Sequence, residues 1–408
     1  MLYFKNSDLA YTHHVSVRTV RNWIEAAKQG KLDLDLHTHA GRQYVSNTAR
    51  NLSTIERMVE DRKKYRPHRA VKVVTPKPEF YHLYNEAQVY DILSNLEIHH
   101  EIPRDYNYFD GGAGNWDKYA NRMASEENPN NLNSTIKLLK LSRDYIDSLI
   151  ANYKSVNIVD IGVGNGLPVK ELIEYLLSKG KLGRYVAIDI SPEMLAIAKR
   201  NVEEWFGDRV DIETYDFDIN HDRFANVLAE DYIKSGGAKV GNIILFLGGT
   251  IQNFRKPDAA LSVIHDSMSK NDLLIHTQKL DTPSSRRFFD FGTSPGDATL
   301  APNHRLIFDL LNIDSSFYNV EMGFDEPKAE RYIRVRLKVA LTIDFKFEAG
   351  HRPISLNKDD TILLWRAWQN NYLQVVNQFE RNDLYMLYNS QTDDQEYLLT
   401  ISRIKRSN

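Results

Sequence analysis

The stretch "VNIVDIGVGNGLPVKELIEYLL" (Val156–Leu177) decides the fold. Its first six residues are mostly apolar and β-branched, which is typical of a strand buried on both faces of a parallel sheet. Asp160 closes this strand, and three glycines follow within five residues: Gly162, Gly164 and Gly166. The apolar and charged residues after them alternate with helical spacing. A glycine-rich loop between a buried strand and a helix predicts a nucleotide-binding site at the helix N-terminus.

The spacing of these glycines narrows the choice of nucleotide. The dinucleotide fingerprint G-x-G-x-x-G requires a glycine where this chain has Leu167. The phosphate-binding pattern G-x-x-x-x-G-K-[ST] does not occur in the sequence. The pattern is instead D-x-G-x-G-x-G, so neither a nicotinamide dinucleotide nor a P-loop nucleotide is favoured.

Three further apolar runs predict parallel strands whose ends carry suitable ligand groups. "GRYVAIDIS" (183–191) ends at Asp189, whose carboxylate is placed to accept the two hydroxyls of a ribose. "VDIETYDFDI" (210–219) includes Asp216 and Phe217, an acid and an aromatic ring that suit an adenine. "VGNIILFLGGTIQNF" (240–254) reaches Gly248, where the reacting end of the ligand is expected.

This ordered set resembles the class I S-adenosylmethionine-dependent methyltransferases. The resemblance implies an α/β fold with a Rossmann-like seven-stranded core. It also implies S-adenosylmethionine as cofactor and S-adenosylhomocysteine as product. Within that class, "LFLGGTIQNF" is similar to the "LFLGSTIGNF" of the histidine Nα-methyltransferase family of the ergothioneine pathway. Similar matches are "YFDGGAG" (108–114), "NHRLIFDLLN" (303–312) and "DFKFEAGHRPI" (344–354).

The resemblance covers roughly residues 80–405 and implies a substrate domain built from two separated segments. The expected order is a linker and first substrate segment at 71–140, a methyltransferase core at 141–281, a second substrate segment at 282–355 and a return to the core at 356–408. In the last part we expect a helix at 359–379, with Trp365 and Trp368 in structural positions, and then a pair of strands.

The resemblance also assigns substrate-binding positions, and there the chain departs from the family. Asn253 matches the residue that holds the head group of the amino acid. Phe109 and Phe289 stand where the family has tyrosines, and a family glutamate falls near Leu356. A site that loses hydrogen-bonding partners for a ligand loses much of its selectivity for it. We therefore expect N-methylation, by in-line displacement, of an amino acid or amine other than free histidine. No catalytic residue is identified.

The first 70 residues differ in composition from the rest. Residues 1–72 hold 14 lysines and arginines against 7 acidic residues, whereas the whole chain has a net charge of −3. Asn6 or Ser7 is expected to cap one short helix and Ser16 a second. The second helix is predicted to bury Val17, Val20, Trp23 and Ile24.

The exposed face of that second helix carries Arg18 and Arg21. The run "VSVRTVRNW" resembles the helix–turn–helix of MerR-like and excisionase-like winged-helix domains, and "HAGRQYVSNT" (39–48) is similar to their wing. The resemblance implies DNA binding through Arg18 and Arg21. A packing or dimerisation domain, and hence a homodimer, remains an alternative.

Composition limits the remaining possibilities. The chain has no cysteine, which excludes disulfides, zinc fingers and a thiol nucleophile. No apolar run is long enough for a membrane span, no metal site is expected, and a cytoplasmic location is favoured. Three functions stay open: a small-molecule methyltransferase, a DNA-binding regulator that senses S-adenosylmethionine or a metabolite, and, last, a methyltransferase acting on nucleic acid.

Overall fold

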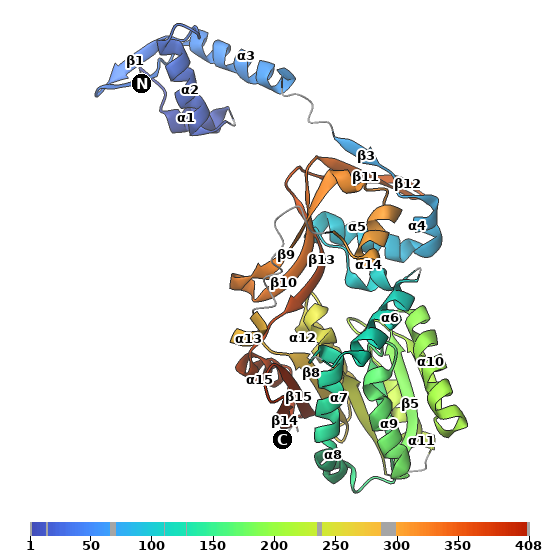
Figure 1. Ribbon diagram of the computed structural model, residues 1–408. Coiled ribbons are helices and arrows are strands. Elements are labelled where there is room, and N and C mark those ends of the chain that lie inside the picture. The colour runs from blue at the N-terminus through green and yellow to red at the C-terminus, as the bar shows by residue number, and fades with distance from the viewer. Residues whose placement is uncertain are drawn as a thin grey trace. The chain divides into compact units, whose positions relative to one another are not determined.

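The computed structural model divides into two compact units, Met1–Val71 and Lys72–Asn408 (Figure 1). Each unit is described by itself. The residues that the structure describes are 2–13, 15–65, 71–109, 111–127, 129–234, 239–286 and 299–405.

The larger unit is built on a seven-stranded sheet with the strand order β14-β15-β8-β7-β4-β5-β6. Five neighbouring strands are parallel, and β15 runs antiparallel to both of its neighbours. The strands are β4 (Ser155–Ile161), β5 (Leu182–Asp189), β6 (Ile212–Asp216), β7 (Val240–Phe246), β8 (Leu273–Lys279), β14 (Leu384–Gln391) and β15 (Tyr397–Ile404). This mostly parallel sheet confirms the predicted α/β methyltransferase fold.

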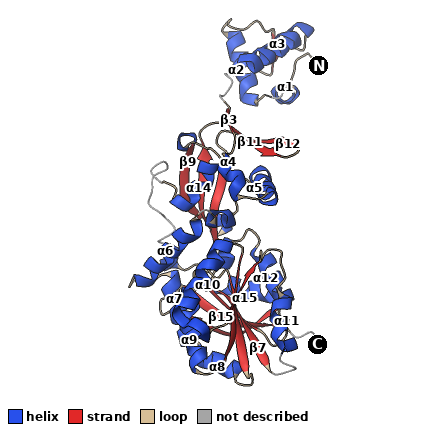
Figure 2. Cartoon of the chain, turned by 90° about the vertical axis from the view of Figure 1, so that its right-hand side faces the viewer, coloured by secondary structure: helices blue, strands red, loops and turns tan. Residues whose placement is uncertain are grey.

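Helices cover both faces of this sheet (Figure 2). Both faces of β4 are apolar and must be covered: Val156 and Ile158 pack into one apolar cluster, and Val159 and Ile161 pack into another. The first cluster lies under α7 (Asn131–Leu141), α8 (Arg143–Ile150), α9 (Lys170–Ser178) and α10 (Pro192–Phe206). The second lies under α11 (Ala225–Lys234), α12 (Pro257–Ser267) and α15 (Tyr372–Arg381).

A smaller domain combines two segments that are far apart in the sequence. Before the central sheet come β3 (Lys72–Val74), α4 (Pro78–Leu83), α5 (Glu86–His99) and the 3₁₀ helix η1 (Arg104–Tyr108). After it come α14 (Pro302–Leu310), β9 (Tyr318–Asp325), β10 (Glu330–Leu337), β11 (Leu341–Phe347), β12 (Gly350–Leu356) and β13 (Thr361–Trp368). The strands form two sheets, β13-β10-β9 and β12-β11-β3.

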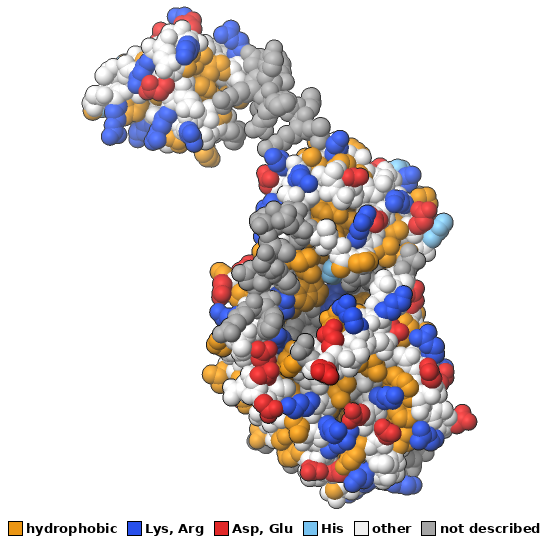
Figure 3. Space-filling view, in the orientation of Figure 1, with side chains coloured by type: hydrophobic (Ala, Val, Ile, Leu, Met, Phe, Trp, Pro, Cys, Tyr) orange, Lys and Arg blue, Asp and Glu red, His pale blue; other side chains and the backbone are white. Residues whose placement is uncertain are grey.

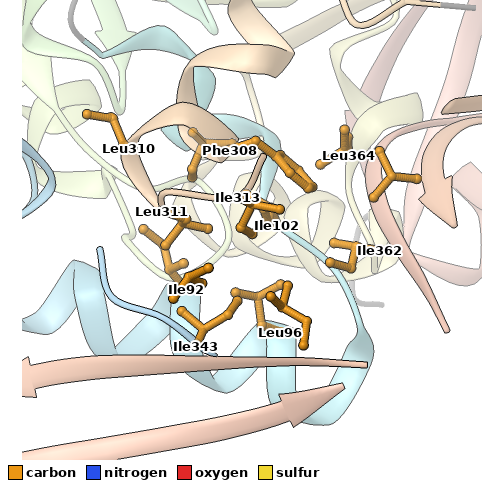
Figure 4. Close-up of a cluster of buried hydrophobic side chains, with 14 of the residues drawn as sticks. Ile92, Leu96, Ile102, Phe308, Leu310, Leu311, Ile313, Ile343, Ile362 and Leu364 are labelled. Carbon is orange, nitrogen blue, oxygen red and sulfur yellow. The ribbon is translucent and has the colours of Figure 1, made fainter. Parts of the chain in front are cut away.

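One apolar core joins the two segments of this small domain (Figure 4). Ile92 and Leu96 of α5 pack with Phe308 of α14 and with Ile343 and Ile362 of the two sheets. The fold therefore places a second domain beside the central sheet without interrupting the order of its strands.

The predicted helix at 359–379 is wrong in its first half. Residues Thr361–Trp368 form the strand β13, which pairs antiparallel with β10. Ile362 and Leu364 alternate with less buried neighbours, as expected for a strand. The helix α15 begins only after Asn371, whose side chain forms a capping box with Gln374.

The smaller unit contains α1 (Asn6–Thr12), α2 (Val17–Lys28), β1 (Leu36–His39), β2 (Arg42–Val45) and α3 (Ala49–Tyr65). Ser16 caps α2 as predicted, accepting a hydrogen bond of 3.1 Å from the Thr19 N–H. The predicted cap of α1 is wrong, because the helix follows Lys5 and has no side-chain cap.

The buried face of α2 is confirmed for Val20, Trp23 and Ile24, whereas Val17 is exposed. The hairpin lies at 36–45, slightly before the predicted wing at 39–48. Its turn uses Ala40 and Gly41, both of which have a positive φ.

Candidate functional site

The glycine loop after β4 makes a tight turn at the carboxyl edge of the central sheet. Gly162, Gly164 and Gly166 have φ values of +65°, +56° and +78°, which L side chains rarely adopt. A Cβ atom on Gly164 would lie 3.3 Å from the indole nitrogen of Trp116. The Gly162 N–H donates to the carbonyl of Ile188 over 2.8 Å, which ties the loop to β5.

Asp189 lies directly beside this loop, at the end of β5. Its carboxylate accepts hydrogen bonds from the backbone N–H of Ser191, over 3.0 Å, and from the backbone of Gly164. Burial raises the pKa of Asp189 to about 6. Asp216 is its register partner on β6, and the Phe217 N–H donates to the Asp189 carbonyl over 3.2 Å. The structure thus brings the four predicted residues Gly164, Asp189, Asp216 and Phe217 to one edge.

Asp160 takes a deeper position than the other predicted residues. It is buried, and its carboxylate accepts a hydrogen bond of 2.8 Å from the hydroxyl of Tyr185 on β5. Burial raises the pKa of Asp160 to about 8. Within the described residues, this acid supports the base of the glycine loop from inside the sheet.

The segment Arg104–Tyr108 packs against α14 and against the helix that follows it in the sequence. The guanidinium carbon of Arg104 lies 5.5 Å from the ring centre of Tyr108 and 5.6 Å from that of Trp116, which belongs to α6 (Gly112–Ser125). Burial raises the pKa of Tyr108, and the Asp189 carboxylate raises it further. Tyr108 is therefore close enough to Asp189, the predicted ribose-binding acid, for the two charges to interact.

Asp105 joins this group from the same turn. Burial raises its pKa to about 7, and the carboxylates of Asp218 and Asp189 raise it as well. His304 of α14 lies on the other side, where burial and the charge of Arg104 lower its pKa to about 4. The Arg104–Tyr108 turn therefore joins both segments of the small domain to the predicted cofactor edge. No local sequence motif predicts that this turn lies near the cofactor edge, because its position depends on the packing of α14 and α6.

The end of β7 is held rigidly. Gly248 and Gly249 have φ values of +69° and +72°, and the side-chain amide of Asn131 donates to the Gly248 carbonyl. The Gly248 N–H donates to the Thr277 hydroxyl over 2.9 Å. Gln252, in the 3₁₀ helix η4 (Thr250–Asn253), donates to the carbonyls of Lys279 and Trp368 over 3.0 and 2.7 Å. These bonds connect the β7 end with β13 of the small domain.

The predicted substrate residues are placed differently from one another. Asn253 is half-buried at the end of η4, and its amide nitrogen makes only long hydrogen bonds of 3.4 Å, to the carbonyls of Gly249 and Thr250. Phe109 packs against the small domain's core, with its ring centre 5.4 Å from that of Tyr84. Phe289 lies outside the described residues.

The expectation that position 356 faces the substrate is wrong. Leu356 is only 3% exposed and belongs to the core of the small domain, opposite Leu341 in the β11–β12 hairpin. The segment that approaches the site is the next strand, β13, because its end contacts η4.

The described residues contain no cluster of three His, Asp or Glu side chains able to hold a metal ion. No helix among them combines the length and apolar character that crossing a bilayer requires.

Comparison with known families agrees with the site. Residues 85–285 match the model of the family described as "Histidine-specific methyltransferase, SAM-dependent", which is just under half of the chain. The chain is an S-adenosylmethionine-dependent methyltransferase, and S-adenosylmethionine is its cofactor. Within that class, the part of the chain that matches the histidine-specific family comprises most of the central sheet together with α5 and η1. No curated protein matches the sequence.

Solved structures similar to this chain are distant. An S-adenosylmethionine-dependent methyltransferase from Clostridium acetobutylicum has 10% identity and a TM-score of 0.39, covering 71% of this chain and 99% of its own. The CcbJ methyltransferase from Streptomyces caelestis has 10% identity and a TM-score of 0.36, with coverages of 68% and 100%. A 1,6-didemethyltoxoflavin-N1-methyltransferase from Burkholderia thailandensis has 10% identity and a TM-score of 0.35, with coverages of 72% and 85%.

Proposed function

We propose that this enzyme methylates a nitrogen of a small amine or amino-acid-like molecule other than free histidine. The observation that carries the proposal is the position of Asn253, whose half-buried amide follows the rigid Gly248–Gly249 turn at the end of β7. The parallel strands β4, β5 and β7 are neighbours, so this amide lies at the same sheet edge as the glycine loop.

The cofactor supplies a methyl group that is already activated, so the protein's task is to position the nucleophile. We expect the glycine loop, Asp189 and the Asp216–Phe217 pair to hold the adenosine portion. The Gly248 turn and Asn253 then orient the accepting nitrogen for in-line displacement. Positioning of this kind supplies much of the acceleration in enzymes that need no covalent intermediate.

Free histidine is disfavoured because the side chains expected to bind it are apolar here. Phe109 has no hydroxyl and packs on Tyr84 and Tyr106. Position 109 therefore offers no hydroxyl to a polar ligand, and a ligand that loses a hydrogen-bonding partner binds more weakly.

The test uses the whole chain. S-Adenosylmethionine and a panel of amino acids and amines, histidine included, are incubated with the enzyme, and products are identified by mass spectrometry. We expect a singly or multiply N-methylated product from a panel member other than histidine. Asn253→Ala should lower its formation by roughly tenfold or more. Asn389→Ala, an exposed residue on β14, serves as the matched control. Efficient methylation of histidine by the unaltered enzyme would refute this part of the proposal.

A second proposal concerns the smaller unit, in which we infer a DNA-binding surface. Arg18 and Arg21 are exposed on α2, opposite the buried Val20 and Trp23. Between α2 and the hairpin lies a groove of about 760 Å³ whose lining includes the basic residues Arg21, Lys28 and Arg42. The lining also includes Glu25, which pairs with Lys28 over 2.7 Å, so Arg18, Arg21 and Arg42 are the cations that suit a phosphate backbone.

Fluorescence anisotropy with a random-sequence duplex tests this second proposal. Binding should weaken steeply as salt rises, because bound phosphates release counterions. Arg18→Ala combined with Arg21→Ala should remove binding while leaving the affinity for S-adenosylhomocysteine unchanged. If the wild-type protein binds no duplex at low salt, the unit serves packing or dimerisation instead.

A further inference from the structure

Helix α6 is attached to the glycine loop at two neighbouring positions. The indole nitrogen of Trp116 lies 3.3 Å from where a Cβ atom on Gly164 would be. Asp117, the next residue, accepts a hydrogen bond of 2.8 Å from the side-chain amide of Asn165. Asn165 is buried within the loop, and its amide oxygen accepts a hydrogen bond of 3.2 Å from the Leu167 N–H. The ring of Trp116 is therefore fixed against the loop that is expected to hold the cofactor.

Tyr108 places a second aromatic ring beside the first. The centres of the Tyr108 and Trp116 rings are 6.2 Å apart, and their planes are nearly perpendicular, at 83°. Burial raises the pKa of Tyr108, and the nearby Asp189 carboxylate raises it further. Because the Gly164 backbone donates to Asp189, both rings border the same edge of the central sheet. Figure 3 shows the surface hollowed between the small domain and the central sheet, with hydrophobic side chains gathered there.

The two rings already contact a positive charge. The guanidinium carbon of Arg104 lies 5.5 Å from the ring centre of Tyr108 and 5.6 Å from that of Trp116. A cation within about 6 Å of a ring centre is attracted by the negative face of the π system. The pair of rings is thus able to stabilise a cation at the cofactor edge.

The neighbouring acids also favour a cation. Burial raises the pKa of Asp105 to about 7, and the carboxylates of Asp218 and Asp189 raise it as well. Arg104 acts in the opposite direction. Carboxylates that raise one another's pKa repel, and a positive charge beside them reduces that repulsion. A cationic ligand at this edge is therefore stabilised by the acids as well as by the rings.

The methyl donor and its product differ in charge, because S-adenosylmethionine carries a positive sulfonium where S-adenosylhomocysteine carries a neutral thioether. We propose that Trp116 and Tyr108 bind the sulfonium through their ring faces, and so raise the affinity for the charged donor relative to the uncharged product. Arg104 opposes this preference, because it places a like charge on the same rings. The preference holds whatever molecule accepts the methyl group, since it concerns the donor alone.

Calorimetry on the full chain, without an acceptor, tests this role with three ligands. They are S-adenosylmethionine, S-adenosylhomocysteine and sinefungin, an analogue with an ammonium group where the cofactor has its sulfonium methyl. For each cation, the quantity compared is the dissociation constant of S-adenosylhomocysteine divided by that of the cation. Trp116→Leu should lower both ratios roughly twofold to thirtyfold, the range for a cation–π contact. Trp116→Phe should keep part of the preference, because it keeps an aromatic ring.

Two further variants separate the effect of charge from a loss of structure. Trp205→Leu removes another tryptophan that packs on the loop, whose ring lies 3.6 Å from where a Cβ atom on Gly166 would be. It should change the affinities for all three ligands by the same factor and leave both ratios unchanged. Arg104→Gln should raise both ratios, because it removes the opposing charge. If Trp116→Leu does not fold, Tyr108→Leu gives the same comparison from η1.

Unchanged ratios in Trp116→Leu overturn the proposal even if every ligand binds more weakly, because a ring with a merely structural role affects charged and neutral ligands alike. A ratio that falls for S-adenosylmethionine but not for sinefungin overturns it too, since this indicates packing on the methyl group. Equal losses of preference in Trp205→Leu and Trp116→Leu also contradict it, as does a ratio that falls in Arg104→Gln.

Discussion

His276 is a single side chain whose placement carries a clear energetic cost. It is fully buried on β8 between the rings of Phe246 and Phe379, at centroid distances of 6.2 and 5.3 Å. Neither ring nitrogen has a hydrogen-bonding partner among the residues that the structure describes. A buried polar group without partners destabilises a fold by roughly 1–3 kcal/mol.

Replacing this imidazole should therefore stabilise the protein. His276→Leu is expected to raise the free energy of unfolding at pH 7 by about 1–3 kcal/mol, because the desolvated nitrogens are removed. Urea denaturation followed by circular dichroism measures the change. His265→Leu on α12, where the ring is bonded to Asp266 over 3.1 Å, is the control and should not stabilise. A destabilised His276→Leu would mean that the imidazole has a partner, such as a buried water.

The same residue predicts a pH dependence. Burial lowers the pKa of His276 to about 3, against about 6.5 when unfolded. Between these values the unfolded state binds a proton that the folded state does not, so stability falls as the pH falls from 6.5 to 3. His276→Leu should reduce this slope in denaturation curves recorded between pH 7 and 4. If both proteins show the same slope, His276 does not titrate as its burial implies.

At the scale of elements, the parts predictable from sequence are those with a strong local signal. β4, its glycine loop and α9 were found because an apolar run, three glycines and helical spacing follow one another. The ends of β5, β6 and β7 followed from the same reasoning. β13 was missed because the run Thr361–Trp368 fits a helix or a strand locally, and its pairing with β10 decides between them.

Contacts that depend on tertiary packing could not be predicted from the local sequence. The turn Arg104–Tyr108 reaches Asp189 only because α6 and α14 hold it over the sheet. Trp365 was interpreted as a packing residue of a helix, whereas it lies half-buried on the strand β13. The sequence thus predicted which residues gather beside the glycine loop and that Asn253 follows the end of β7, whereas their roles toward cofactor and substrate stay predictions.

The start of α15 gives a prediction for one element. The Asn371 side-chain oxygen accepts a hydrogen bond of 3.0 Å from the Gln374 N–H, and the Gln374 side-chain oxygen accepts one of 2.8 Å from the Asn371 N–H. Asn371→Ala should lower the free energy of unfolding by about 1 kcal/mol, because the Gln374 N–H loses its acceptor. Thermal or urea denaturation is the measurement, with Asn389→Ala as the control. An unchanged stability would show that water replaces the cap at no cost.

On the scale of the whole molecule, the buried acid Asp160 makes the free energy of unfolding depend on pH. Burial raises the pKa of Asp160 to about 8, well above its value of about 3.9 when unfolded. Between these values the folded state binds one more proton than the unfolded state. The proton's contribution to the free energy of unfolding is therefore present at low pH and is lost as the pH rises toward 8. Asp160→Asn keeps an acceptor for the Tyr185 hydroxyl and removes this titration.

The stability of Asp160→Asn relative to the wild type should therefore increase as the pH rises from 5 to 8. Urea denaturation series at several pH values provide the comparison, and Asp208→Asn, on the exposed turn after α10, is the control. A constant difference between the two proteins would show that Asp160 is already ionised at pH 5.

The central claim is that the cofactor lies along the edge formed by the glycine loop and Asp189. Calorimetric titration with S-adenosylhomocysteine tests it most directly, using the wild type, Asp189→Ala and the control Asp208→Ala. We expect Asp189→Ala to weaken binding by about 1.5–3 kcal/mol, as is usual for hydrogen bonds to a charged group, and Asp208→Ala to bind like the wild type. An unchanged dissociation constant for Asp189→Ala would contradict the placement of the cofactor and with it the orientation of the whole site.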